Sequence, residues 1–208
     1  MKENKLYTIG HSKHSTEYFI QLLNKYSINC IIDVRSIPYS KIAPQFNKES
    51  ILKDLKDNNI LYSHMPEEFG ARKNNQNLLD LEGKVDFQKI RDTEKFKIGI
   101  EKIKNGVFKD FNVALMCSEA NPFDCHRFVM IAYQLVNENI NVKHILKDGN
   151  IIENAELEKQ LLIKYSKILP VNNLFVNNVT EKLRLDCAYR LRNKDIAFTS
   201  IETDNILQ

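Results

Sequence analysis

Short apolar runs alternate with helix-patterned segments from residue 6 to residue 146, and this alternation constrains the fold more than any other feature. The apolar runs predict strands at residues 6–9, 28–34, 60–63, 112–116 and 141–146. Segments such as 15–26 and 87–104 carry apolar residues at helical spacing between them. Strands joined by helical crossovers pair in parallel and are covered by helices on both faces. We therefore predict a three-layer α/β domain with a mainly parallel sheet of about five strands.

The length of the chain sets the expected domain organisation. A chain of 208 residues is close to the size of one ordinary domain. We predict a single α/β domain over residues 1–175, followed by a C-terminal extension, 176–208, that is docked or partly flexible. Residues 66–83 are polar and lack a clear pattern. We expect a partly mobile loop there, at a position suited to a lid.

Composition excludes several classes of protein. No apolar stretch approaches the roughly 20 residues that span a bilayer, and the N-terminus lacks the pattern of a secretory signal. The net charge of +3 is too small for a non-specific nucleic-acid clamp. The four cysteines form no C-x-x-C pair. We expect a cytoplasmic protein with reduced thiols and no membrane association.

Residues with reactive or charged side chains follow the predicted strands. The first four strands are followed by His11, by Arg35, by His64 and Glu67, and by Cys117 with Glu119. The carboxyl ends of parallel strands share one edge of a sheet, and ligands bind in the crevice there. We therefore expect a functional site at this edge, provided that the strands are parallel.

The segment from Cys117 to Arg127 is the densest group of such side chains. Asn121 is a suitable cap, and Pro122 suits the first position of a helix. Free amide groups at a helix start favour an anion, and Arg127 adds a positive charge if it faces the edge of the sheet. The same environment would acidify a thiol, which makes Cys125 the better candidate for a reactive cysteine.

Three mechanisms are conceivable at this segment. A zinc site from Cys117, Cys125 and His126 is disfavoured, because adjacent residues of a helix point about 100° apart. A phosphatase-like loop needs backbone amides around the anion and an arginine soon after a nucleophilic cysteine. It fits poorly, since Pro122 removes an amide and Arg127 comes ten residues after Cys117. Sulfur transfer is a third option, because the strand-end residues loosely resemble rhodanese-like domains, although the short glycine-containing loop after the cysteine is absent.

Other side chains complete the predicted site. Asp33 and Arg35 either form an ion pair that holds a loop or take part in function, because buried charges are costly unless they are paired or used. Tyr39 and Phe46 are candidates for aromatic walls on which a base or sugar stacks.

Several motifs in series resemble one prokaryotic family. They are Thr8 to Ser12, Asp33 to Ser36, Pro38 to Ser40, Pro44 to Asn47, Tyr62 to Pro66, Gly70 to Arg72, Cys117 to Arg127, and His144-Ile145 with Asp148-Gly149. Over about residues 5–175 the chain is similar to the domain-of-unknown-function 488 family. The family commonly has Gly-Gly-Arg where this chain has Gly70-Ala71-Arg72. The resemblance implies no reaction, but it implies that the following residues occupy motif positions: His11, Asp33, Arg35, Glu119, Cys125, His126 and Arg127.

Together these observations predict an enzyme that acts by acid–base chemistry on an anionic substrate, either a nucleotide, a nucleic acid or a phosphorylated metabolite. The expected catalytic residues are His11, Asp33, Glu119, Cys125 and His126. The expected substrate-binding residues are Arg35, Tyr39, Phe46, Arg72, Cys117 and Arg127. We expect no metal and no cofactor, and the oligomeric state stays open. The alternatives are a thiol or sulfur carrier that uses Cys117 or Cys125, and a non-catalytic nucleic-acid-binding module.

Overall fold

A six-stranded sheet forms the centre of the computed structural model, which describes residues 6–172 and 177–200. Its strands are β1 (Leu6–Gly10), β2 (Cys30–Asp33), β3 (Leu61–His64), β4 (Val113–Cys117), β5 (Val142–Ile145) and β6 (Ile151–Glu153). Their order is β3-β2-β4-β1-β5-β6, and every neighbouring pair is parallel except β5 and β6. The predicted α/β fold with a mainly parallel sheet is confirmed.

The sixth strand was not predicted. Gly149, at a φ of +78°, lies in the tight turn that follows β5 and returns the chain as β6. A strand of three residues is too short to show a pattern of its own in the sequence.

Helices and helical turns fill the connections between the strands. The α-helices are α1 (Thr16–Lys25), α2 (Lys48–Asp57), α3 (Pro66–Phe69), α4 (Phe87–Arg91), α5 (Glu94–Phe108), α6 (Tyr133–Asn137), α7 (Asn154–Lys164) and α8 (Glu181–Ile196). Three 3₁₀ turns, η1 (Pro44–Phe46), η2 (Gln76–Leu78) and η3 (Pro122–Asp124), and one π-helix, η4 (Arg127–Ala132), complete the set. No helix in the described part of the chain has both the length and the apolar character that crossing a membrane requires.

Two sequence-based expectations about these connections need correction. The single helix expected over 87–104 is two helices, because Thr93 caps a new helix by accepting a hydrogen bond from the Phe96 amide. The region 66–83, expected as an irregular loop, contains α3 and η2, and Leu79 is buried in it. A lid function for this region stays a prediction.

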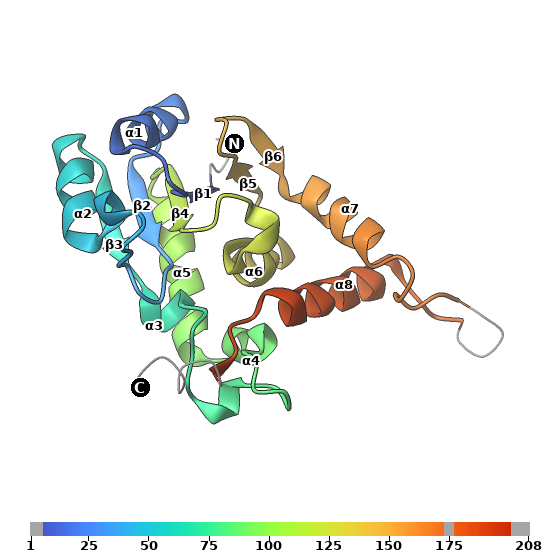
Figure 1. The fold of residues 1–208 in the computed structure, drawn as a ribbon. Coiled ribbons are helices and arrows are strands. Elements are labelled where there is room, and N and C mark those ends of the chain that lie inside the picture. The colour runs from blue at the N-terminus through green and yellow to red at the C-terminus, as the bar shows by residue number, and fades with distance from the viewer. Residues whose placement is uncertain (1–5, 173–176, 201–208) are drawn as a thin grey trace.

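Two apolar clusters cover the two faces of the sheet, so the molecule has three layers (Figure 1). One cluster joins the sheet to α1 and α2, and the other joins it to α5, η4, α6, α7 and α8. Every residue of β1 and β4 is buried, as expected for central parallel strands. In Figure 1, α8 (red) crosses beside α6 and α7 toward α4.

The connections diverge between the neighbouring strands β2 and β4. The chain leaves β2 through α2 on one face to reach β3, and it leaves β4 through η4 and α6 on the other face to reach β5. Adjacent parallel strands whose connections separate in this way leave a crevice at their carboxyl ends. The topology thus locates the candidate site.

Candidate functional site

A cavity of about 560 Å³ lies at the carboxyl ends of β2 and β4. Seven of the predicted site residues line it: Arg35, Tyr39, Arg72, Cys117, Glu119, Cys125 and His126. The other four predicted residues, His11, Asp33, Phe46 and Arg127, are buried and do not line it. Ligand pockets in proteins commonly enclose a few hundred Å³, so the cavity can hold a small molecule.

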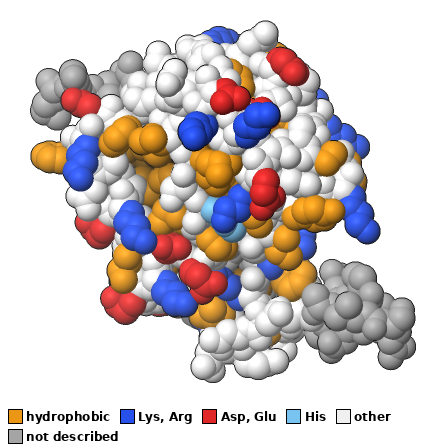
Figure 2. Space-filling view, turned by 90° about the vertical axis from the view of Figure 1, so that its left-hand side faces the viewer, with side chains coloured by type: hydrophobic (Ala, Val, Ile, Leu, Met, Phe, Trp, Pro, Cys, Tyr) orange, Lys and Arg blue, Asp and Glu red, His pale blue; other side chains and the backbone are white. Residues whose placement is uncertain are grey.

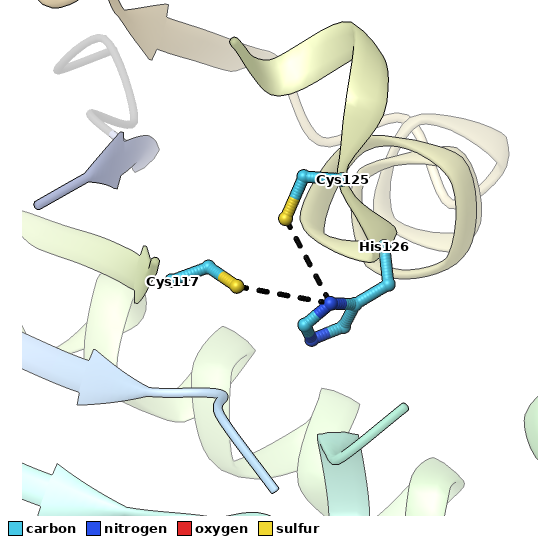
Figure 3. Close-up of side chains that lie close together, drawn as sticks. All are labelled: Cys117, Cys125 and His126. Atoms are coloured by element: carbon cyan, nitrogen blue, oxygen red, sulfur yellow. Dashed lines mark hydrogen bonds between the residues drawn. The ribbon is translucent and has the colours of Figure 1, made fainter. Parts of the chain in front are cut away.

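Two thiols and an imidazole come together at this cavity (Figure 3). Cys117 ends β4, Cys125 follows η3, and His126 directly precedes η4. The Nδ1 atom of His126 lies 3.8 Å from the sulfur of Cys117 and 3.7 Å from the sulfur of Cys125. The three ligand atoms all lie within 4.8 Å of one another.

A backbone carbonyl determines which ring nitrogen of His126 carries the proton. The Nε2 atom lies 3.1 Å from the oxygen of Val34. A carbonyl only accepts hydrogen bonds, so Nε2 carries the proton and donates it to Val34. In the neutral ring, Nδ1 is then an unprotonated nitrogen whose lone pair points at the two sulfurs.

The geometric argument against a three-residue site is wrong. It assumed that Cys125 and His126 lie next to each other on a helix, with Asn121 and Pro122 at its start. Instead η3 ends at Asp124, and the residue after it, Cys125, has an extended backbone with φ −133° and ψ 144°. Both side chains therefore turn toward Cys117 (Figure 3). The helix start expected to favour an anion is a single 3₁₀ turn, η3.

The two buried thiols differ in acidity. The Cys125 hydrogen bond and burial raise the pKa of Cys117 well above the ordinary thiol value. Burial alone would raise the pKa of Cys125, but the hydrogen bond to Cys117 and the nearby Arg127 and His126 bring it well below that value. The pair is thus suited to hold one thiolate, on Cys125.

Arg127 does not line the cavity wall, contrary to expectation. Its side chain is fully buried and points into the protein. Nε donates to the Thr8 hydroxyl, while the terminal nitrogens donate to the backbone oxygens of Glu119 and Ala120. These bonds fasten the loop after β4, so Arg127 acts on the site through the backbone and through its charge.

Asp33, His11 and Phe46 are likewise buried and do not line the cavity. Asp33 holds the Arg35 guanidinium in two hydrogen bonds of 2.9 and 2.6 Å, and Tyr62 donates a third bond to its carboxylate. His11 lies against Arg35, and burial and that charge lower its pKa to about 4. The ring of Phe46 stacks on His11 with a centroid distance of 4.3 Å. These side chains therefore pack behind Arg35 and hold it in place.

Four charged side chains line the cavity, and two of them, Arg35 and Asp124, are held in ion pairs with Asp33 and Arg192. The other two are Arg72 and Glu119. Arg72 is exposed, and its guanidinium lies 5.6 Å from the ring centroid of Phe198. No carboxylate of the described residues forms an ion pair with it. Burial and the neighbouring Cys125 raise the pKa of Glu119. The cavity therefore offers a cation for a substrate anion and a carboxyl group for proton transfer.

The C-terminal part of the chain supplies cavity residues that the sequence did not indicate. Ile196 and Phe198 line the cavity, and Arg192 holds η3 by donating to the Phe123 oxygen and pairing with Asp124. The balanced charges and weak periodicity of this region gave no signal for such a role.

His64 and Glu67, both expected at this edge of the sheet, lie in different places. The ring of His64 hydrogen-bonds to the Arg35 oxygen, beside the ion pair. Glu67 instead pairs with Lys95 at the surface.

Comparison with protein-family models matches residues 15–134 to DUF488, a domain of unknown function. The chain belongs to the DUF488 family. The family match includes β2, β4 and the Cys117–His126 segment, but it is narrower than the expected range of 5–175 and omits β1 and α8. Comparisons with curated proteins and with solved structures return no match. The DUF488 assignment therefore names a family and no reaction.

Proposed function

We propose that this DUF488 protein is an enzyme that acts on a small anionic substrate, a nucleotide or another phosphorylated metabolite, or the end of a nucleic acid. The observation that carries the proposal is the composition of one cavity. It combines an arginine without a described carboxylate partner, a partly buried carboxyl group and the Cys117–Cys125–His126 group.

Arg72 is the proposed anchor for the anion. A guanidinium binds phosphate or carboxylate oxygens through two parallel hydrogen bonds. Arg35 adds positive charge to the wall, but Asp33 already occupies two of its donors. Tyr39, which is 61% exposed at the cavity, offers a ring on which a base or sugar stacks.

Glu119 is the proposed proton-transfer group, and the sulfur–imidazole group is the proposed reacting centre. Both nitrogens of His126 already face partners, so this ring serves the two cysteines and does not act as a free acid or base. Of the residues expected to act as acid or base, we therefore assign proton transfer to Glu119, which lines the cavity, and not to His126.

A thiol or sulfur carrier is the second candidate, and the observation that favours it is the pair of buried sulfurs next to one imidazole. Such a carrier would bear its cargo on Cys125 or Cys117. If Cys125→Ser and Cys117→Ser each keep full activity, the thiol mechanism is excluded.

A non-catalytic nucleic-acid-binding module has less support. Figure 2 shows acidic and basic side chains interspersed on the face it presents, without a broad basic field. Non-specific binding to nucleic acid depends on such a field. We also propose that the protein works in the cytoplasm, because reduced cysteines at a reacting centre need a reducing compartment.

Anion binding is tested by titrating inorganic phosphate and adenosine monophosphate into the full chain in a calorimeter at low salt. Loss of a charged hydrogen-bonding partner costs about 1.5–3 kcal/mol, so Arg72→Ala should weaken binding by about tenfold or more. Arg190→Ala is the matched control, since Arg190 is exposed on α8 and does not line the cavity. Equal affinities of the two variants, or no binding by the unchanged protein, would contradict the proposed binding site.

Catalysis is tested with a panel of nucleotides and sugar phosphates, measured as release of phosphate or base. Glu119→Gln should lower turnover by about a hundredfold or more while leaving anion binding in place. Undiminished turnover by this variant would remove Glu119 from the mechanism.

A further inference from the structure

We propose that Cys117, Cys125 and His126 bind a zinc ion and leave one coordination position open to the cavity. The inference concerns the reacting centre of the proposed function, but metal binding can be measured without any substrate.

The spacing of the ligand atoms fits one tetrahedral ion. Zinc–sulfur and zinc–nitrogen bonds of about 2.3 and 2.05 Å at tetrahedral angles place sulfur and nitrogen about 3.6 Å apart. The two sulfur–nitrogen distances at His126 are 3.8 and 3.7 Å. Both distances are within a few tenths of an ångström of that value. The two sulfurs lie within 4.8 Å of each other, and sulfurs on one tetrahedral ion are about 3.8 Å apart.

His126 is oriented as a metal ligand. Histidine ligands in proteins commonly donate their second ring proton to a carbonyl or carboxylate, which fixes the ring and directs the free lone pair at the metal. The bond from Nε2 to the Val34 oxygen has this arrangement. Two thiolates with one imidazole form a donor set that zinc prefers.

The fourth position is left to the cavity. No carboxylate of the described residues joins the three-residue group, and all three residues line the cavity. Three protein ligands with an open position are typical of catalytic zinc, whereas structural zinc has four.

Charge balance also permits the ion. Each thiol releases its proton to solvent as its sulfur bonds to zinc, so the two thiolates neutralise the 2+ charge. The zinc–dithiolate group is therefore neutral, and the charge of the buried Arg127 acts on it from nearby. This arginine then favours an anionic fourth ligand, either hydroxide or the substrate itself.

The site assigns a reaction class to the cavity, namely hydrolysis by metal-bound water. A zinc ion held by these three residues would supply a Lewis acid and an activated water at the open position. Glu119 lines the same cavity and would take up the proton as this water adds to the electrophilic atom of the substrate. The bond to the leaving group would break with its electron pair, and the leaving group would take the proton from Glu119. No oxidant or reductant is needed.

The test uses the full chain, purified under reducing conditions, dialysed against zinc and then freed of loose metal. Elemental analysis should find close to one zinc per chain. Cobalt loaded in its place should give a sulfur-to-cobalt charge-transfer band and the intense visible bands of a four-coordinate ion. The cobalt spectrum is measured on the unchanged protein, so it does not depend on the folding of a variant.

Variants then locate the ion. Cys117→Ser, Cys125→Ser and His126→Gln should each lower zinc affinity at least a hundredfold, whereas Cys30→Ser should bind zinc normally. Cys30 is the matched control because it begins β2, at the edge of the sheet opposite the cavity. Circular dichroism of each variant verifies its fold.

Three results would overturn the inference. They are no zinc in the reduced protein, a cobalt spectrum without sulfur ligation, or metal retained by a folded variant that carries all three substitutions. Formation of a Cys117–Cys125 disulfide by a reduced protein that takes up no metal would instead indicate a redox pair. Failure here leaves the anion-binding test with Arg72→Ala unaffected, and failure of that test leaves the metal content unaffected. The two proposals can therefore fail separately.

Discussion

Two buried arginines support the candidate site, and the protein holds them in different ways. Arg35 has a carboxylate partner in Asp33, and both side chains are almost completely shielded from water. The guanidinium of Arg127 donates only to neutral oxygens. A buried cation is costly without compensation, and the charge of Arg127 is one of the causes that lower the pKa of the nearby Cys125 thiol.

The Asp33–Arg35 pair can be tested by removing one charge. Asp33→Asn keeps the size of the side chain but leaves the buried Arg35 uncompensated, so the free energy of unfolding should fall by about 3–5 kcal/mol. Urea denaturation measures the change. Glu67→Gln, which removes a charge from a fully exposed pair with Lys95, should have no measurable effect. Equal effects of the two substitutions would contradict the structural role assigned to Asp33.

At the scale of elements, the loops after β1 and β4 pass very close to each other. Arg127 fastens the backbone oxygens of Glu119 and Ala120, and these residues cross the end of β1 at Gly10. A Cβ atom at position 10 would lie 1.8 Å from the Glu119 oxygen, so only glycine fits there. The position of Glu119 at the cavity therefore depends on a glycine in another strand.

Gly10→Ala tests this crossing. The added methyl group forces the loop at Glu119 away from β1, and we expect a loss of about 3 kcal/mol or more in the free energy of unfolding. Gly106→Ala is the control, because its Cβ would meet only Val113, at 3.6 Å, and alanine favours a helix by roughly 0.5–1 kcal/mol. Thermal denaturation of both variants gives the comparison, and a harmless Gly10→Ala would disprove the tight crossing.

At the scale of the whole molecule, a helix outside the family match completes the site. Tyr189 and Ala188 of α8 are buried in the core cluster, and the chain after α8 pairs with Val85 through the Phe198 oxygen. This path brings Phe198 to the cavity wall. The expected division of the chain at residue 175 stays a prediction, but α8 packs against the body of the domain.

Arg192 connects α8 with the turn before Cys125. It donates to the Phe123 oxygen and stacks on the Phe123 ring, with its Cζ atom 4.7 Å from the centroid. Arg192→Ala should cost about 1–3 kcal/mol and loosen this turn, whereas Arg190→Ala on the exposed side of α8 should be neutral. Chemical denaturation measures stability, and the rate of thiol labelling at Cys125 measures loosening. Unchanged labelling in Arg192→Ala would show that α8 does not support the site.

Most strands and part of the candidate site could be predicted from the sequence, because both depend on local sequence patterns. Apolar runs between helical segments predicted five of the six strands, and the residues at strand ends predicted three of the cavity residues, Arg35, Cys117 and Glu119. Strand ends are informative because parallel strands bring their carboxyl ends to one edge whatever their order.

Side-chain direction was decided by the tertiary structure. Periodicity indicates which residues are buried, but it does not distinguish Arg35, at the cavity wall, from Arg127, which turns inward to Thr8. The same applies to Cys125 and His126, since the extended backbone at Cys125 ends a helix that the sequence predicted to continue. The Phe198 wall depends on packing between segments more than one hundred residues apart. The sequence by itself determined the sheet and the chemistry at its edge, whereas long-range packing decided which side chains meet there.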